Sequence, residues 1–136
     1  MGAWSHGAFE NDAALDWLAT AKGDGLPETV EDALRSATAA SYLEVDEGSS
    51  AVAAAMLVAA ALDGDTENLP DDARALVRGW HTAPALRQLA LGALDAASGP
   101  RSELASLWGE GPDASAWRVG IERLRARLAA ERHHEA

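Results

Sequence analysis

The sequence predicts an all-α fold: a single compact helical domain of about six or seven short helices around a central, alanine-rich helix at residues 51–62. Apolar residues recur at the spacing of helices, and the alternating pattern of strands is missing. Alanine, the strongest helix former, is the commonest residue. Residues 51–62 contain no charged side chain, and a helix that is apolar on every face has to be enclosed by its neighbours.

Capping residues and helix breakers predict the first two helices. Asn11-Asp12 offers an N-cap for a helix that continues to about residue 20, and Gly23 ends it. Pro27 fits the first turn of a second helix, where its missing N–H is tolerated. The predicted inward face of this second helix consists of four residues at helical spacing: Val30, Leu34, Ala37 and Ser41.

The segments on either side of the central helix are predicted to be loops. Residues 42–50 form a polar, acidic connection, in which Ser49 or Ser50 caps the central helix. Residues 63–69 form a second loop, whose acidic start resembles a calcium-binding loop. The glycine and the bidentate glutamate that a calcium loop requires are absent, so an ordinary acidic turn is predicted there.

Four further helices are predicted in the second half of the chain. Pro70 opens one that ends near Gly79, and the next two span about 84–97 and 102–108. The inward residues of the helix at 84–97 are Leu86, Leu89, Ala93 and Leu94. Asp113 caps the last helix. Its predicted buried stripe consists of Trp117, Ile121, Leu124 and Leu128.

The length of 136 residues fits one domain, predicted to span residues 1–130 with a polar, frayed tail at 131–136. The absence of cysteine excludes disulfides, thiolate metal sites and cysteine nucleophiles. No basic segment followed by an apolar stretch opens the chain, and the longest apolar run is shorter than the roughly 20 residues of a membrane span. We therefore expect a cytoplasmic protein without membrane contact.

Negative charge is concentrated in the first half of the chain. Residues 1–72 hold fifteen acidic side chains against Lys22 and Arg35, a net charge of −13, whereas residues 73–136 carry +2 of the total of −11. An acidic surface repels phosphate groups, so nucleic acid and anionic membranes are poor partners. A basic protein partner is expected instead. The same pattern is also typical of a solvated surface that only promotes solubility.

The N-terminal segment carries the densest group of candidate site residues. Its members are Trp4, His6, Phe9, Asn11, Asp12 and Asp16. Asp12 and Asp16 are four residues apart, so both carboxylates lie on one helix face, within reach of one cation or one basic side chain. His6 is a third candidate metal ligand, and Glu44 is a candidate assisting residue. In the structural alternative, the polar residues cap the helix and the aromatic ones pack.

Residues 1–17, Met-Gly-Ala-Trp-Ser-His-Gly-Ala-Phe-Glu-Asn-Asp-Ala-Ala-Leu-Asp-Trp, resemble the opening of a bacterial family called domain of unknown function 4259. The resemblance extends to Tyr42-Leu43-Glu44, the alanine-rich helix, Ser102-Glu103-Leu104 with Trp108, and the stripe from Trp117 to Leu128. Ser5 stands where the family's opening has glycine. The resemblance implies a small helical protein whose N-terminal residues form one motif, and it implies no particular activity, substrate or catalytic residue.

Three hypotheses for the function follow. The first is a non-enzymatic interaction protein, immunity-like or regulatory, whose acidic half binds a basic protein. No complete catalytic constellation and no cofactor-binding motif occurs in the sequence, which favours this hypothesis, and no cofactor is expected. The second is a metal-dependent or carboxylate-using enzyme centred on Asp12 and Asp16. The third is a helical domain that binds a small molecule in a pocket lined by tryptophans. The partner and the oligomeric state do not follow from the sequence.

Overall fold

In the computed structural model the chain folds into α-helices, and no strand occurs among the described residues, which are 12–66, 69–78, 80, 84–109 and 114–130. The helices within these residues are α1 (Asp12–Asp24), α2 (Leu26–Ala39), α3 (Val45–Asp63), α4 (Asp71–Val77), α5 (Pro84–Ala97), α6 (Glu103–Gly109) and α7 (Ala114–Ala129). The predicted all-α class is confirmed. The predicted tail at 131–136 lies outside the described residues.

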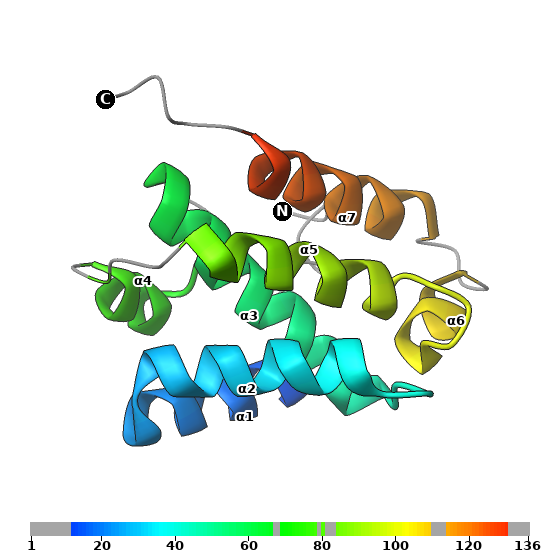
Figure 1. Cartoon of the computed structure of the whole chain (residues 1–136), viewed down its shortest axis with the longest axis horizontal. Helices are drawn as coiled ribbons and strands as arrows, with labels where there is room; N and C mark the ends of the chain where they lie inside the picture. Colours follow the sequence, from blue (N-terminus) through cyan, green and yellow to red (C-terminus); the bar gives the residue numbers. More distant parts are fainter. Residues whose placement is uncertain (1–11, 67–68, 79, 81–83, 110–113, 131–136) are drawn as a thin grey trace.

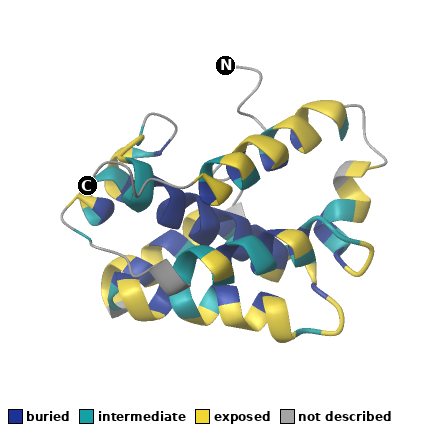
Figure 2. Cartoon of the chain, turned by 45° about the horizontal axis from the view of Figure 1, so that its top comes forward, coloured by how far each residue is buried: buried dark blue, intermediate teal, exposed yellow. Residues whose placement is uncertain are grey.

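The helix α3 is the centre of the molecule and contacts each of the other helices α1, α2 and α4 to α7. Every residue from 51 to 60 is buried, and most of them are alanine. Figure 2 shows this buried helix crossing the middle of the fold. Because alanine side chains are small, the neighbouring helices approach α3 closely and still fill the interior. The prediction of a central, enclosed helix is confirmed.

The other helices surround α3 on all sides (Figure 1). The pair α1 and α2 lies on one side and α7 on the opposite side, while α4 and α6 lie at the two ends. The helix α5 contacts α2, α3 and α7. Its approach to α2 is close, because a Cβ atom on Gly92 would lie 3.2 Å from the Cγ2 atom of Thr38.

The chain reverses sharply between α1 and α2. Gly25 alone joins the two helices, and its φ of 106° is a backbone conformation that glycine adopts at no steric cost. Pro27 lies in the first turn of α2, as predicted. The residues Val30, Leu34 and Ala37 are buried, which confirms most of the predicted inward face. Ser41 was wrongly included in that face, because α2 ends at Ala39 and Ser41 is exposed beyond it.

The central helix begins earlier than expected. The prediction that Ser49 or Ser50 caps it was wrong, since α3 starts at Val45 and Ser49 is buried within it. Glu44 occupies the N-cap position. The carboxylate of Glu47 accepts a hydrogen bond from the backbone N–H of Glu44 at 3.1 Å, as in a capping box. The acidic residues that were expected in a loop therefore form the first turn of α3.

The segments that precede α3 and α6 pair with each other. Leu43 and Ser102 form an isolated parallel bridge: the N–H of Leu43 donates to the carbonyl of Arg101 at 2.9 Å, and the N–H of Glu103 donates to the carbonyl of Leu43 at 2.8 Å. The Glu103 carboxylate also accepts a hydrogen bond from the backbone N–H of Val45 at 2.9 Å. Two stretches quoted above for the family resemblance thus meet in the structure and fix the start of α3.

The helices of the second half follow the predicted pattern. In α5 the fully buried residues are Ala90, Ala93, Leu94 and Ala97, and the predicted inward residues Leu86 and Leu89 are half-buried. The predicted stripe of α7 is buried in full: Trp117, Ile121, Leu124 and Leu128. Pro70 occupies the N-cap position of α4, which ends at Val77. Asp113, the predicted cap of α7, lies outside the described residues.

An ion pair fastens the C-terminal end of α7 to that of α3. The guanidinium of Arg127 donates to both carboxylate oxygens of Asp63, with Nε–Oδ2 at 2.8 Å and Nη2–Oδ1 at 2.9 Å, and to the carbonyl of Asp65 at 2.8 Å. The two side chains are only 20% and 13% exposed. The hydrogen bond with Asp63 outweighs the effect of burial and raises the pKa of Arg127 above its ordinary value. The guanidinium is therefore positively charged at neutral pH.

The 19-residue helix α3, with a mean hydropathy of 1.4, is long and apolar enough to cross a membrane by length and composition alone. In the folded chain 67% of that stretch is buried against the other helices. The core helix of a globular domain passes the same test of length and composition, and α3 is buried as such a helix is.

Candidate functional site

A cavity of about 400 Å³ opens between α1, α2 and α3, on the acidic half of the chain. We call it the acidic groove. Its lining consists of one aromatic residue, three carboxylates and several small or hydroxyl-bearing residues: Trp17, Thr20, Thr29, Asp32, Ala33, Ser36, Asp46, Glu47 and Ser50. The groove therefore combines an apolar surface with concentrated negative charge.

Each of the three helices contributes residues to the groove, and the apolar pattern of its sequence determines which of them are left accessible. The inward stripe of α2 packs against the core, which leaves Asp32 and Ser36 exposed on the other face. Trp17 of α1 packs against the core and is half-buried, so part of its side chain stays accessible from the groove. Asp46 and Glu47 reach the groove because they lie in the first turn of α3, where acidic residues interact favourably with the helix dipole.

The carboxylates of the groove have no basic counterpart among the described residues. Lys22 forms its ion pair with Asp72 at 2.9 Å, and Arg35 pairs with Glu31 at 2.6 Å. None of the ion pairs found within the described part of the chain includes the groove carboxylates: Asp32, Asp46 and Glu47. The only two basic residues of the first 72 are thus both engaged elsewhere.

Two hydroxyls of the groove are already used locally. The hydroxyl of Thr29 donates to the carbonyl of Gly25 at 2.8 Å, and that of Thr20 donates to the carbonyl of Asp16 at 3.3 Å. Both oxygens keep lone pairs that can accept a hydrogen bond from a donor in the groove. The lining is therefore rich in hydrogen-bond acceptors, and none of its residues is positively charged.

The sequence-predicted site residues lie only partly within the described part of the chain. Four of them lie outside it: Trp4, His6, Phe9 and Asn11. Asp12 is the first residue of α1, and its side chain is not described. Asp16 is exposed on α1, and Glu44 is the exposed N-cap of α3; neither lines the groove. The groove is lined instead by their neighbours in the sequence, Trp17 and Asp46.

The candidate metal site remains a prediction. Within the described residues no group of three or more histidine, aspartate or glutamate side chains is arranged to hold a metal ion. Two of the candidate ligands, His6 and the side chain of Asp12, lie outside that part of the chain.

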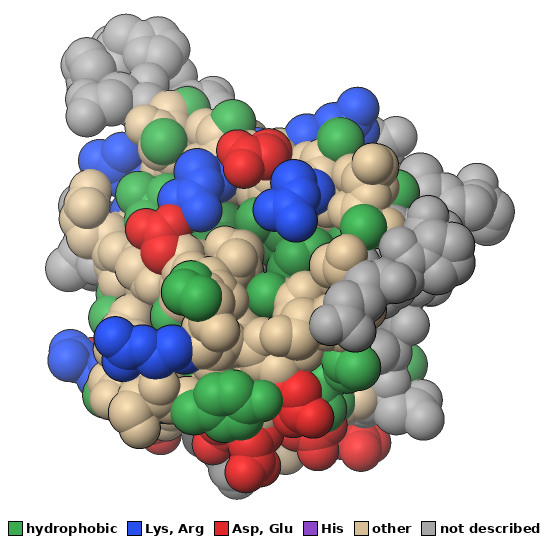
Figure 3. Space-filling view, turned by 90° about the vertical axis from the view of Figure 1, so that its right-hand side faces the viewer, with side chains coloured by type: hydrophobic (Ala, Val, Ile, Leu, Met, Phe, Trp, Pro, Cys, Tyr) green, Lys and Arg blue, Asp and Glu red, His purple; other side chains and the backbone are tan. Residues whose placement is uncertain are grey.

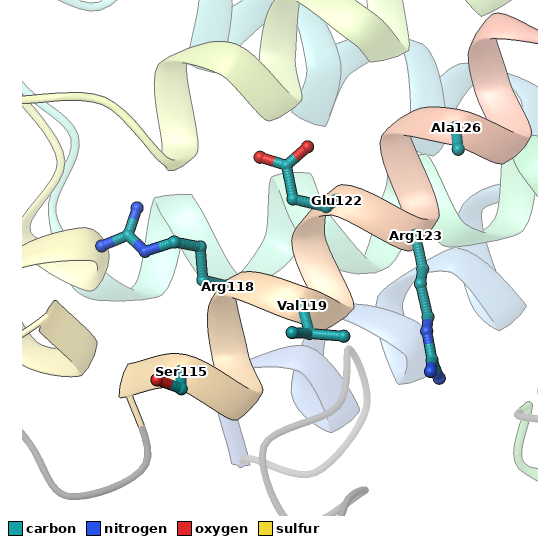
Figure 4. A pocket seen from close by; sticks show the side chains of 6 residues that line it. All are labelled: Ser115, Arg118, Val119, Glu122, Arg123 and Ala126. Carbon is teal, nitrogen blue, oxygen red and sulfur yellow. The ribbon is translucent and has the colours of Figure 1, made fainter.

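The outer face of α7 forms a second surface of opposite charge. A space of about 480 Å³ lies over it, lined within the described residues by Ser115, Arg118, Val119, Glu122, Arg123 and Ala126. Val119 is 49% exposed at its centre, and the side chains of Arg118 and Arg123 extend in different directions on either side (Figure 4). Figure 3 shows acidic side chains gathered along the lower edge of the molecule, whereas in the upper part basic and acidic side chains lie side by side. Acidic side chains therefore predominate at one edge of this face.

Residues 2–119 match the sequence model of a family described as a domain of unknown function, DUF4259. The chain belongs to the domain of unknown function 4259 family. The match includes all the residues of the acidic groove and only the first turns of α7. No curated protein and no solved structure matches this member of the family. The family description assigns no activity, so the function has to be argued from the site.

The groove was not predicted from the sequence. Asp46 and Glu47 were expected in a loop, and Trp17 was not among the candidate site residues. Acidic residues are favoured in the first turn of a helix, as Asp71 and Asp72 are in α4, and this rule would have placed Asp46 and Glu47 at a helix start. The side-by-side placement of α1, α2 and α3 has no local sequence signal.

Proposed function

We propose that this member of the family is a non-enzymatic interaction protein that binds a basic segment of a partner protein in its acidic groove. The observation that carries the proposal is the groove itself: three carboxylates without a described counter-charge line a cavity next to a half-buried tryptophan. Positive side chains of a partner would supply the missing charge, and the field of a chain with a net charge of −11 would guide them to it.

The size and shape of the cavity favour a protruding segment over a flat protein surface. A cavity of about 400 Å³ is large enough for one or two long side chains and lies within the range typical of ligand pockets. The carboxylates come from α2 and α3, whereas the aromatic surface comes from α1, so a segment laid across the groove meets all three helices. A basic loop or terminus of the partner fits this arrangement.

The test is the binding of labelled peptides of about ten residues, one rich in arginine, one rich in lysine and one acidic, measured by fluorescence anisotropy at low salt. The wild type should bind the two basic peptides and not the acidic one. A triple variant, Asp32→Asn, Asp46→Asn and Glu47→Gln, should bind them about tenfold more weakly, as expected for three ion pairs of roughly 0.5 kcal/mol each. Gln at position 47 keeps the hydrogen bond to Glu44.

A matched control separates the groove from the total charge. The variant Glu28→Gln, Asp95→Asn and Glu122→Gln removes three exposed negative charges that do not line the groove, and it leaves the ion pair between Lys22 and Asp72 intact. When both triple variants are compared with the wild type at about 0.1 M salt, where the Debye length is roughly 10 Å, the control should keep the wild-type affinity within about twofold, because exposed charges farther away than this are largely screened. Equal weakening in both triple variants, or no binding of either basic peptide by the wild type, would refute the proposal.

A low-salt pull-down from lysate extends the test to natural partners. The wild type and the two triple variants are compared as baits, after circular dichroism has shown that all three are folded. A basic protein that the wild type and the control variant retain, and the groove variant loses, identifies the partner. Such a protein should then bind the purified wild type directly.

A further inference from the structure

Trp17 is the single aromatic residue that lines the acidic groove. Its side chain is held by packing against the core on one side and remains accessible in the groove on the other. Trp117 of α7, by contrast, is almost completely buried, with 5% of its surface exposed. Trp17 therefore presents part of an indole surface at a fixed place next to carboxylates.

We propose that the groove is an arginine site, in which the guanidinium plane of a partner's arginine stacks on the indole of Trp17 while its N–H groups donate to Asp32 and Asp46. This inference rests on the proposed function, because it names the side chain through which the basic segment is recognised. The two carboxylates come from α2 and α3 and line the same cavity as the indole. Stacking and charge pairing are thereby available to one side chain at the same time.

The chemistry of the lining favours arginine over lysine. A guanidinium is planar, weakly hydrated and carries five N–H donors, so it can stack on an aromatic face and still donate at its edge. The acceptors around Trp17 are numerous: besides the carboxylates, the hydroxyl oxygens of Ser36 and Ser50 line the cavity. A lysine ammonium is a compact, strongly hydrated charge with three donors, and it would leave more of these acceptors without a partner.

The decisive measurement needs no variant. Two peptides of identical length and charge, one with arginine and one with lysine at the basic positions, are titrated against the wild-type protein. The arginine peptide should bind about tenfold more tightly, within the range of a desolvated cation–aromatic contact. A third peptide with citrulline, which keeps the planar shape and lacks the charge, should show no binding.

Variants assign the preference to Trp17. Trp17→Leu keeps an apolar side chain and removes the aromatic surface, so it should lower the affinity for arginine to that for lysine and leave the affinity for lysine unchanged. Trp17→Phe should retain part of the preference. Trp80→Leu is the matched control, because Trp80 is also half-buried against the core but does not line the groove. It should keep the full preference.

The outcomes separate this inference from the proposed function. Equal affinity of the wild type for the arginine and lysine peptides would overturn the arginine site and leave a general basic-segment site standing. A preference that survives in Trp17→Leu would overturn the role of the indole. Failure of both basic peptides to bind would refute the proposed function and the inference together.

Discussion

The ion pair between Arg127 and Asp63 links two helices that are far apart in the sequence, α7 and α3. The two residues are 64 residues apart in the sequence and close the C-terminal ends of α7 and α3 against each other. The guanidinium uses Nε and Nη2 on the carboxylate and the carbonyl of Asp65, and its Nη1 lies 3.2 Å from the sulfur of Met56. Removal of the arginine would deprive the largely buried Asp63 carboxylate of its guanidinium counter-charge, although the backbone N–H of Asp65 would still donate to it.

We expect Arg127→Ala to lower the free energy of unfolding by about 2–4 kcal/mol, somewhat less than the loss of a fully buried partner because the pair is partly exposed. Urea denaturation followed by circular dichroism measures this change. Arg123→Ala on the outer face of the same helix is the control and should change stability by no more than about 0.5 kcal/mol. Similar losses in the two variants would mean that the ion pair contributes nothing specific.

The pH dependence of this contribution follows from the sign of the pKa shift. Because the folded-state pKa of Arg127 is raised, its contribution to stability is fully present below the ordinary pKa of an arginine side chain and is lost only as the pH rises above that strongly basic range. The titration of Arg127 therefore leaves stability unchanged throughout the neutral range.

The ion pair between Arg127 and Asp63 could not be predicted from the sequence, although the environment of each residue could be in part. Asp63 was predicted to begin the acidic turn at 63–69, whereas in the structure it is the last residue of α3. Arg127 is not part of the predicted buried stripe of α7, and its side chain is partly exposed. Their pairing depends on how α3 and α7 pack, and spacing along the chain carries no information about that.

At the scale of the element, α3 and α6 approach each other at Gly48. A Cβ atom on Gly48 would lie 3.2 Å from the Cβ atom of Leu104 and 3.7 Å from the Oγ atom of Ser102. Gly48 was predicted to lie in the polar, acidic connection at 42–50, and glycine is a poor helix former. In the structure it lies inside the first half of α3 and is buried, so the close contact with α6 outweighs its low helix propensity.

Two glycine-to-alanine variants should therefore have opposite effects. Gly48→Ala should destabilise the protein by about 1–3 kcal/mol, because the added methyl group forces α6 away from α3. Gly120→Ala in α7 should stabilise it by up to about 1 kcal/mol, since no described atom lies within 4 Å of the added carbon and alanine is the better helix former. Thermal unfolding of both variants beside the wild type tests the pair. Stabilisation by Gly48→Ala would contradict the close approach.

Helix positions were predictable where the apolar stripe and a breaker agree, as in α2 and α7. The start of α3 was not, because serine, glycine and acidic residues at 44–50 are typical of loops as well as of first turns. The pairing of Leu43 with Ser102 decides between these alternatives, and it is formed by segments far apart in the sequence.

At the scale of the whole molecule, the charge asymmetry of the sequence becomes an asymmetry in space. The net charge of −13 over residues 1–72 predicted an acidic surface, and the structure adds a cavity at one place on it. The prediction of a basic partner stays a prediction. The location of the groove could not be predicted, since three helices have to be packed before its lining residues come together.

Binding of basic peptides should depend strongly on salt. Raising the NaCl concentration from about 0.1 M to about 1 M shortens the Debye length from roughly 10 Å to roughly 3 Å, and we expect the affinity to fall at least about tenfold. The melting temperature serves as the control and should not decrease, because salt also screens the repulsion within the acidic half. An affinity that is independent of salt would point to apolar binding instead.

The enclosure of α3 has a consequence for the growing chain on the ribosome. The helices that cover α3 come from both sides of it in the sequence, and α5 and α7 are synthesised 34 and 66 residues after its last residue, counted to their own ends at Ala97 and Ala129. At common rates of translation this leaves an apolar helix without its cover for on the order of several seconds. During that interval α3 has the length and hydropathy of a membrane-spanning segment and lacks the cover of α5 and α7. Chaperones and targeting factors that bind apolar segments of nascent chains would therefore bind this protein at α3, before folding is complete.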